Sequence, residues 1–218
     1  YDIEMDEEIT IIDTNARNKR IKNFFINNKK KLIITVLIIS VIIIGYLTFE
    51  NSKEKNKIKL ANQYNLALID LNPENKQKTI DEMVNVVKSN DATYSPLALY
   101  HLLDNNLLEN NDEINILFNE LIEKTNLDKE IKNLIIYKKA LFNSDLVSEN
   151  ELLKILNPVI NSESIWKSHS LYLLAEFFYS KNEKQNAKEF FNQILVLPNA
   201  NSAIKTESQK RLNRDLGE

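Results

Sequence analysis

The sequence predicts an all-α protein in which one membrane-spanning helix precedes a domain of stacked helical hairpins. The first observation behind this fold class is an unbroken apolar run from Leu32 to Phe49. The second is the recurrence of apolar side chains at three- and four-residue spacing through almost all of the chain that follows. The third is the scarcity of turn residues, since the chain has only 2 glycines and 4 prolines and a β architecture would need many more.

The run from Leu32 to Phe49 is long enough to cross a bilayer. At about 1.5 Å per residue a helix over this range extends roughly 27 Å, close to the hydrocarbon thickness. A buried core helix is a weak alternative at this length. A cleaved signal peptide is the stronger alternative, but Tyr46 to Phe49 offers no small residues for cleavage. We therefore expect a permanent anchor over residues 32–49, a largely disordered tail over 1–31 and a repeat domain over 50–218.

Basic residues flank the predicted span unequally. Before it stand Arg17, Lys19, Arg20, Lys22 and Lys29 to Lys31, and after it stand Lys53, Lys55, Lys57 and Lys59. Because basic segments are retained on the cytoplasmic side, the amino terminus is expected in the cytoplasm. The carboxyl-terminal domain would then face outward, which in a bacterium means the periplasm.

The tail before the span carries an acidic stretch from Asp2 to Glu8. This stretch could bind a basic partner or could keep an unfolded tail soluble, and the second interpretation is favoured because like-charge blocks usually stay unfolded. The basic residues nearer the span are expected to rest on anionic lipid head groups. Because the chain begins at Tyr1 rather than at methionine, we expect further residues upstream.

Composition argues against several classes of function. A formal net charge of −3 gives no basic face for nucleic acid. The chain has no cysteine and only 2 histidines, His101 and His169, neither with the spacing of a metal motif. Pairs of carboxylates such as Glu120 and Glu123 suit a solvated helix face. The sequence therefore predicts neither an enzyme nor a bound cofactor or metal.

The sequence after the span predicts nine helices, arranged as about four pairs and a capping helix. They are expected over Lys53–Leu71, Lys76–Lys88, Thr93–Leu108, Asp112–Lys124, Asp128–Phe142, Glu149–Ile160, Ser164–Ser180, Lys184–Leu197 and Ser202–Asp215. The starts at Thr93, Asp128 and Ser164 lie about 35 residues apart, a period typical of helix-turn-helix solenoids. Ala175 and Ala187 would let two antiparallel helices approach closely. An irregular bundle with a chance period is the alternative.

The segment from Trp166 to Pro198 resembles a tetratricopeptide repeat. Leu171, Leu174, Ala175, Phe178, Ala187, Phe191 and Pro198 fall at or within one place of the signature positions, and Asn182 replaces the signature glycine. Leu102 stands where an earlier repeat should have a small residue. The whole layout, with a tail, one span, about four helix pairs and a polar capping helix, is similar to the single-pass ancillary subunits of the Sec translocon. This resemblance implies an inner-membrane protein that serves export and envelope chaperones.

A groove lined by the first helix of each pair is the candidate binding site. Its expected lining is Leu134, Tyr137, Leu141, His169, Tyr172, Glu176 and Tyr179. Tyr137 and Tyr172 recur at the same register and would offer stiff contact surface with a polar tip. The alternative is that both tyrosines pack between helices and meet no ligand.

Two functions remain open from the sequence. The first is a binding scaffold whose partners are Sec translocon subunits, exported chains or periplasmic chaperones. The second is a structural protein that forms homo-oligomers or ties the membrane to cell-envelope or division assemblies. In both, the lipid bilayer holds the chain and nucleic acid is not a partner.

Overall fold

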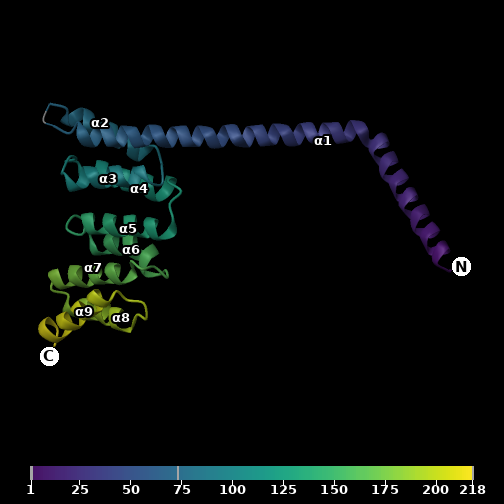
Figure 1. Ribbon diagram of the computed structural model, residues 1–218. Coiled ribbons are helices and arrows are strands. Elements are labelled where there is room, and N and C mark those ends of the chain that lie inside the picture. The colour runs from purple at the N-terminus through teal and green to yellow at the C-terminus, as the bar shows by residue number, and fades with distance from the viewer. Residues whose placement is uncertain (1, 73, 218) are drawn as a thin grey trace. The chain divides into compact units, whose positions relative to one another are not determined.

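The computed structural model describes residues 2–72 and 74–217, with side chains from Arg17 onward. All regular structure in these residues is helical, so the predicted all-α class is confirmed (Figure 1). The helices are α1 (Asp2–Ile69), α2 (Lys76–Lys88), α3 (Tyr94–Asp104), α4 (Asn111–Lys124), α5 (Lys129–Asn143), α6 (Glu149–Ile160), α7 (Lys167–Ser180), α8 (Lys184–Val196) and α9 (Ser202–Asp215).

The amino-terminal unit of the chain, which ends at Ile58, is formed by α1. Within the described residues α1 is the one helix long and apolar enough to cross a membrane, and its apolar window is not buried against protein. Ser40 donates its hydroxyl proton to the carbonyl of Val36 at 2.9 Å, and Thr48 donates to Ile44 at 2.9 Å. These bonds satisfy the hydroxyls within the helix, as a lipid environment requires.

The structure differs from the sequence expectation at both ends of the span. Residues 2–31, expected to be largely disordered, are helical, and no helix boundary separates the span from the helix expected to begin at Lys53. Extending an existing helix costs far less than nucleating a new one, and neither flank has a glycine or proline to stop it.

The carboxyl-terminal unit, from Lys59 onward, is compact. Its helices lie side by side in chain order (Figure 1), and from α2 to α9 each packs on the next. The most extensive contacts are those of α7 with α8, α2 with α3, and α5 with α6. The last turns of α1 belong to this unit, since Ala67 is fully buried and Tyr64 lies against Tyr94 with ring centroids 5.9 Å apart.

Helices α3, α5, α7 and α9 begin at Tyr94, Lys129, Lys167 and Ser202, close to the expected starts. Hydrogen bonds repeat the same spacing. The Thr125 hydroxyl donates to Asn90 Oδ1 at 3.0 Å, the Ile165 amide to Glu130 Oε2 at 3.1 Å, and Arg211 Nε to Glu176 Oε1 at 2.7 Å, each across 35 residues. The first bond lies at the ends of α2 and α4, the second at the starts of α5 and α7, and the third within α7 and α9, so the bonds share a spacing but lie at different places along the helices.

One pairing differs from the expected repeat. The sequence pairs α3 with α4, but α3 packs more extensively on α2 than on α4. Leu102 on α3 is fully buried where a small residue was expected, and a large side chain at such a position keeps neighbouring helices apart.

The compact unit contains two hydrophobic clusters. The first extends from Ala67 to Ile135, and the second from Ala140 to Leu216. Helix α5 contributes Ile135 to one and Ala140 to the other. The compact unit therefore has two hydrophobic cores, and α5 contributes to both.

At three helix ends an asparagine occupies the left-handed position where glycine is most common. Asn90, Asn106 and Asn182 have φ values of 57°, 50° and 63°, in the left-handed region. After α7, the Asn182 amide donates to the Tyr179 carbonyl at 3.0 Å and the Glu183 amide donates to the Phe178 carbonyl at 2.9 Å. This is a Schellman closure, and asparagine tolerates it better than other residues with a side chain.

We expect Asn182→Ala to destabilise the compact unit by about 1 kcal/mol, because a β-carbon without a helpful polar group is strained at positive φ. Asn182→Gly should unfold at or slightly above the parent temperature. Thermal unfolding of both variants beside Asn192→Ala, an exposed position inside α8, measures the effect. Equal melting of the alanine and glycine variants would contradict it.

Candidate functional site

The seven predicted groove residues lie on two helices. Leu134, Tyr137 and Leu141 belong to α5, and the other four belong to α7. Leu141 is 49% exposed, while the remaining six are half-buried. Half-burial means that each side chain packs on its neighbours and still reaches solvent.

An aromatic cluster joins α5 to α7. Tyr137 stacks on Trp166 with ring centroids 5.9 Å apart and an interplanar angle of 19°. His169 lies against both, 5.9 Å from the Tyr137 ring and 5.1 Å from the Trp166 ring. Burial raises the pKa of the Tyr137 hydroxyl. We call Tyr137, Trp166 and His169, with the exposed Leu141, the aromatic face.

The other groove tyrosines contact helices beyond α7. Tyr172 lies edge-on to Phe191 of α8, with centroids 5.6 Å apart, and Phe191 is fully buried. Desolvation, reinforced by Glu176, raises the pKa of Tyr172 to about 12. Tyr179 lies beneath the guanidinium of Arg211, 4.5 Å from its ring centre. Tyr172 and Tyr179 are therefore partly structural, and for Tyr172 this packing is what the alternative interpretation of the sequence expected.

Glu176 of α7 forms an ion pair with α9. Arg211 of α9 donates to both Glu176 oxygens, from Nε at 2.7 Å and from a terminal nitrogen, and a further bond joins it to Asp215. The Arg211 side chain is 15% exposed. A bidentate pair with little exposure is among the stronger charged contacts in proteins.

Asp215 makes the stability of this contact depend on pH. Hydrogen bonds from Arg214, and then from Arg211, lower the pKa of Asp215 from 3.8 to about 2. A depressed carboxyl pKa adds stability that is complete above the unfolded value and is lost as pH falls. We therefore expect the parent to lose stability between about pH 4 and pH 2 relative to Asp215→Asn.

Melting temperatures of the parent and Asp215→Asn across that pH range measure the effect. Asp104→Asn, at an exposed position on α3, is the control and should parallel the parent. Parallel pH curves for the parent and Asp215→Asn would contradict the linkage.

Sequence reasoning missed several residues on this side of the unit. Lys138 Nζ lies 4.4 Å from the ring centre of Tyr100 and links α5 to α3. Burial raises the pKa of Tyr100 to about 12. Arg211 could have been found, because it lies one 35-residue period after Glu176. Trp166 could have been found too, since it stands three residues before His169 on the same face.

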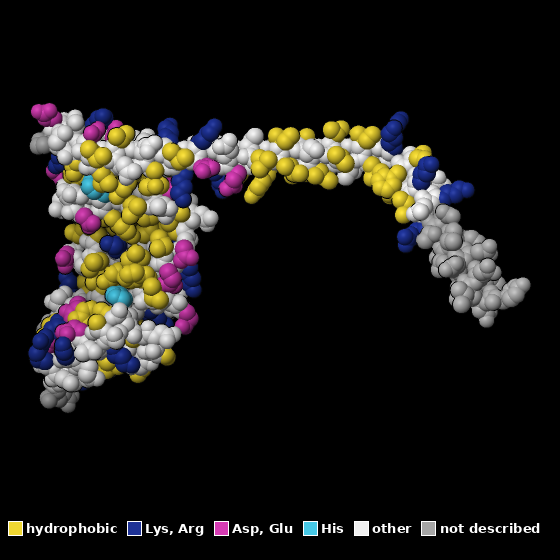
Figure 2. All heavy atoms as spheres, in the orientation of Figure 1, with side chains coloured by type: hydrophobic (Ala, Val, Ile, Leu, Met, Phe, Trp, Pro, Cys, Tyr) yellow, Lys and Arg dark blue, Asp and Glu magenta, His cyan; other side chains and the backbone are white. Residues whose placement is uncertain are grey.

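Hydrophobic side chains gather over the middle of the compact unit, with charged side chains towards its margins (Figure 2). Several polar atoms near α3 and α7 are buried without a hydrogen-bond partner in the described structure, among them Tyr100 Oη, His101 Nε2 and His169 Nδ1. Burying such groups unpaired is costly.

The titratable side chains of the described residues are dispersed over the unit. In the part of the chain that the structure describes, no three histidine, aspartate or glutamate side chains converge on a possible metal position. His169 is surrounded by aromatic rings rather than by carboxylates.

Comparison with known proteins adds no assignment to this geometry. No protein-family model matches the chain, and neither the curated proteins nor the solved structures contain a significant match to it.

Proposed function

We propose that this protein is a membrane-anchored scaffold that binds a protein partner through the aromatic face of α5 and α7. The observation that carries the proposal is the stacked Tyr137–Trp166 pair beside His169, half-buried and adjacent to the exposed Leu141. Tyrosine and tryptophan dominate binding energy at protein interfaces because they bring large, rigid surface with a polar tip.

The stacking helps binding in a second way. Tyr137 is fixed by Trp166 and His169 before any partner arrives. A side chain that is already ordered loses less conformational entropy on association. The aromatic face is thus suited to recognition without rearrangement.

The sequence resemblance is the basis for proposing a fold, an orientation and partners for this scaffold. We propose a tetratricopeptide-like solenoid that faces the periplasm from a bacterial inner membrane, with its amino terminus in the cytoplasm. Its partners would be Sec translocon subunits, exported chains or periplasmic chaperones. Hydrogen bonds repeated across 35 residues support the solenoid, and the basic residues before the span support the orientation.

Affinity recovery from gently solubilised membranes, followed by mass spectrometry, tests the proposal. We expect Tyr137→Ala with Leu141→Ala to lose the partners recovered by the parent, with the unit still folded. Ile116→Ala is the matched control, because Ile116 is 59% exposed on α4 and lies outside the aromatic face. Unchanged recovery by the double variant would reject the aromatic face, and recovery of only its own copies would favour the structural alternative.

A further inference from the structure

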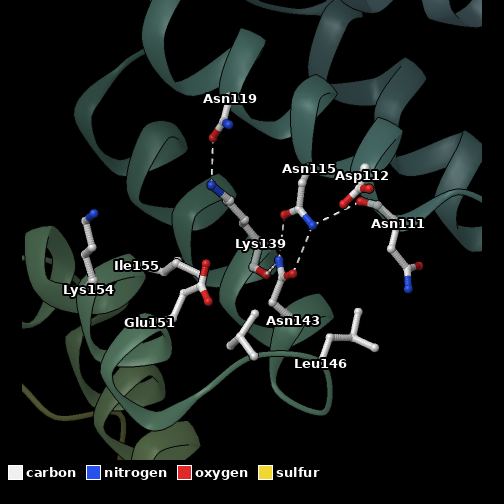
Figure 3. A pocket seen from close by; sticks show the side chains of 11 residues that line it. Asn111, Asp112, Asn115, Asn119, Lys139, Asn143, Leu146, Glu151, Lys154 and Ile155 are labelled. Atoms are coloured by element: carbon white, nitrogen blue, oxygen red, sulfur yellow. Dashed lines mark hydrogen bonds between the residues drawn. The ribbon is translucent and has the colours of Figure 1, made fainter.

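A pocket on another side of the compact unit lies between α4, α5 and α6 (Figure 3). Its volume is about 670 Å³, within the range of ligand sites. On α5 it is lined by Lys139 and Asn143, each two residues from a member of the aromatic face and so about 200° away around the helix. The pocket is therefore separate from the site of the proposed function.

Asparagines from two helices line the pocket. Asn111, Asn115 and Asn119 follow one another at four-residue spacing on α4, which places them on one side of the helix. Asn115 and Asn143 exchange hydrogen bonds, at 3.0 Å and 2.8 Å, and Asn143 also donates to the Lys139 carbonyl at 2.7 Å. This amide pair joins α4 to α5. Asn115 also donates to the Asn111 carbonyl at 3.0 Å, so the amide hydrogens of both residues are used. Asn143 is buried, which leaves the spare lone pair of Asn115 Oδ1 as the acceptor open to a ligand.

Donors remain unused beside this pair. Lys139 donates one hydrogen bond, to Asn119 Oδ1 at 2.6 Å (Figure 3), although an ammonium has three donors. No carboxylate lies within 4.0 Å of Lys139 among the described residues. Burial lowers the pKa of Lys139, against the opposing effect of Glu123 and Glu151. The pocket thus offers free donors at Lys139 and at the Asn119 amide, next to an acceptor at Asn115 Oδ1.

The spacing of these groups matches an extended chain. Residues four apart on a helix are separated by about 6 Å along its axis, while two residues of a strand span about 6.6 to 6.8 Å. A carboxamide carries the same donor and acceptor as a peptide group. Asn115, through the free lone pair of its Oδ1, and Asn119, through its amide hydrogens, can therefore meet alternate peptide groups of a strand that runs along α4.

The remaining lining favours a ligand without net charge. Lys139 and Lys154 are balanced by Asp112 and Glu151. Leu146, Val147 and Ile155 form an apolar wall on which small side chains could rest. We propose that this pocket binds an uncharged stretch of extended polypeptide by its main chain, with peptide carbonyls accepting from Lys139 and Asn119 and a peptide N–H donating to Asn115 Oδ1.

The test uses the full chain in lipid nanodiscs and the peptide trifluoroacetyl-(Ala-Ser)₄-amide, which has no charged terminus. Binding is followed by ¹⁹F line broadening. We expect saturable binding that weakens about tenfold or more when alternate peptide nitrogens are methylated, because methylation removes the main-chain donors. Equal binding of the methylated peptide to the parent protein would overturn the proposal, and this arm needs no variant to fold.

Variants locate the site. Asn119→Ala with Lys139→Met should weaken binding about tenfold or more, since two main-chain acceptors lose their donors. The matched control is Asn192→Ala with Lys188→Met on α8, outside this pocket, and it should bind like the parent. Undiminished binding by the Asn119 and Lys139 variant would overturn the assignment.

Two further arms distinguish the pocket from the aromatic face and from a simple anion site. Tyr137→Ala with Leu141→Ala should bind the peptide like the parent, so that failure of the aromatic face leaves this proposal standing. Loss of peptide binding in that variant would move the site to the aromatic face and overturn the pocket. Displacement of the peptide by millimolar acetate would mark an anion site and would also overturn it.

Discussion

Phe191→Ala is expected to destabilise the compact unit by about 3 to 5 kcal/mol. Phe191 on α8 is fully buried and belongs to the second hydrophobic cluster. Its ring also supports Tyr172 of α7 at 5.6 Å. Removing it leaves a cavity that rigid helices on several sides can only partly close, and the loss of transfer energy adds to the cost of the cavity.

The fluorescence of Trp166 measures this effect in urea. Trp166 is the only tryptophan in the chain and lies within the compact unit, so its signal reports this unit rather than the anchor. Phe190→Ala is the control, since Phe190 is the same residue type one position away and is only half-buried against Phe178. An equal loss of stability in both variants would contradict the structure, because it would mean that α8 buries Phe190 as deeply as Phe191.

Ala175→Leu is expected to cost about 1 to 3 kcal/mol through overpacking. Ala175 and Ala187 are both fully buried, on the two helices with the most extensive contact in the unit. Where backbones approach this closely, three added carbons force side chains off their rotamers or push the helices apart. The substitution therefore tests the small-residue register that the sequence predicts.

Circular dichroism melting beside Ala203→Leu separates overpacking from the mere addition of a leucine. Ala203 lies exposed near the start of α9 and has room for a larger side chain. We expect that control to melt like the parent. If Ala175→Leu also melts like the parent, α7 and α8 do not approach at this position.

The candidate site was only partly predictable from sequence. Helical periodicity placed Tyr137 and His169 on neighbouring helices, but their contact depends on how α5 and α7 are rotated against each other. The same periodicity could not tell that Tyr172 lies on Phe191 while Leu141 remains 49% exposed. Three-four spacing defines a face of a helix, whereas the neighbour that covers it is chosen by packing.

The asparagine pocket had no sequence signal that set it apart. Asparagine is abundant throughout the chain, and Asn111, Asn115 and Asn119 read as an ordinary solvated face. Their role depends on Asn143 and Lys139 of the next helix, which complete the hydrogen bonds. Such a site exists only once two helices are brought together.

The sequence by itself determined the all-α class, the apolar span from Leu32 to Phe49 and the positions of α2 to α9 to within a few residues. These features are local, because they depend on periodicity, on the scarcity of glycine and proline, and on the length of an apolar run. Tertiary structure alone decided that α3 prefers α2, that Tyr172 lies on Phe191 and that a polar pocket lies between α4, α5 and α6. Those features depend on the shapes of side chains that meet across distant parts of the chain, and close packing allows few ways for them to fit.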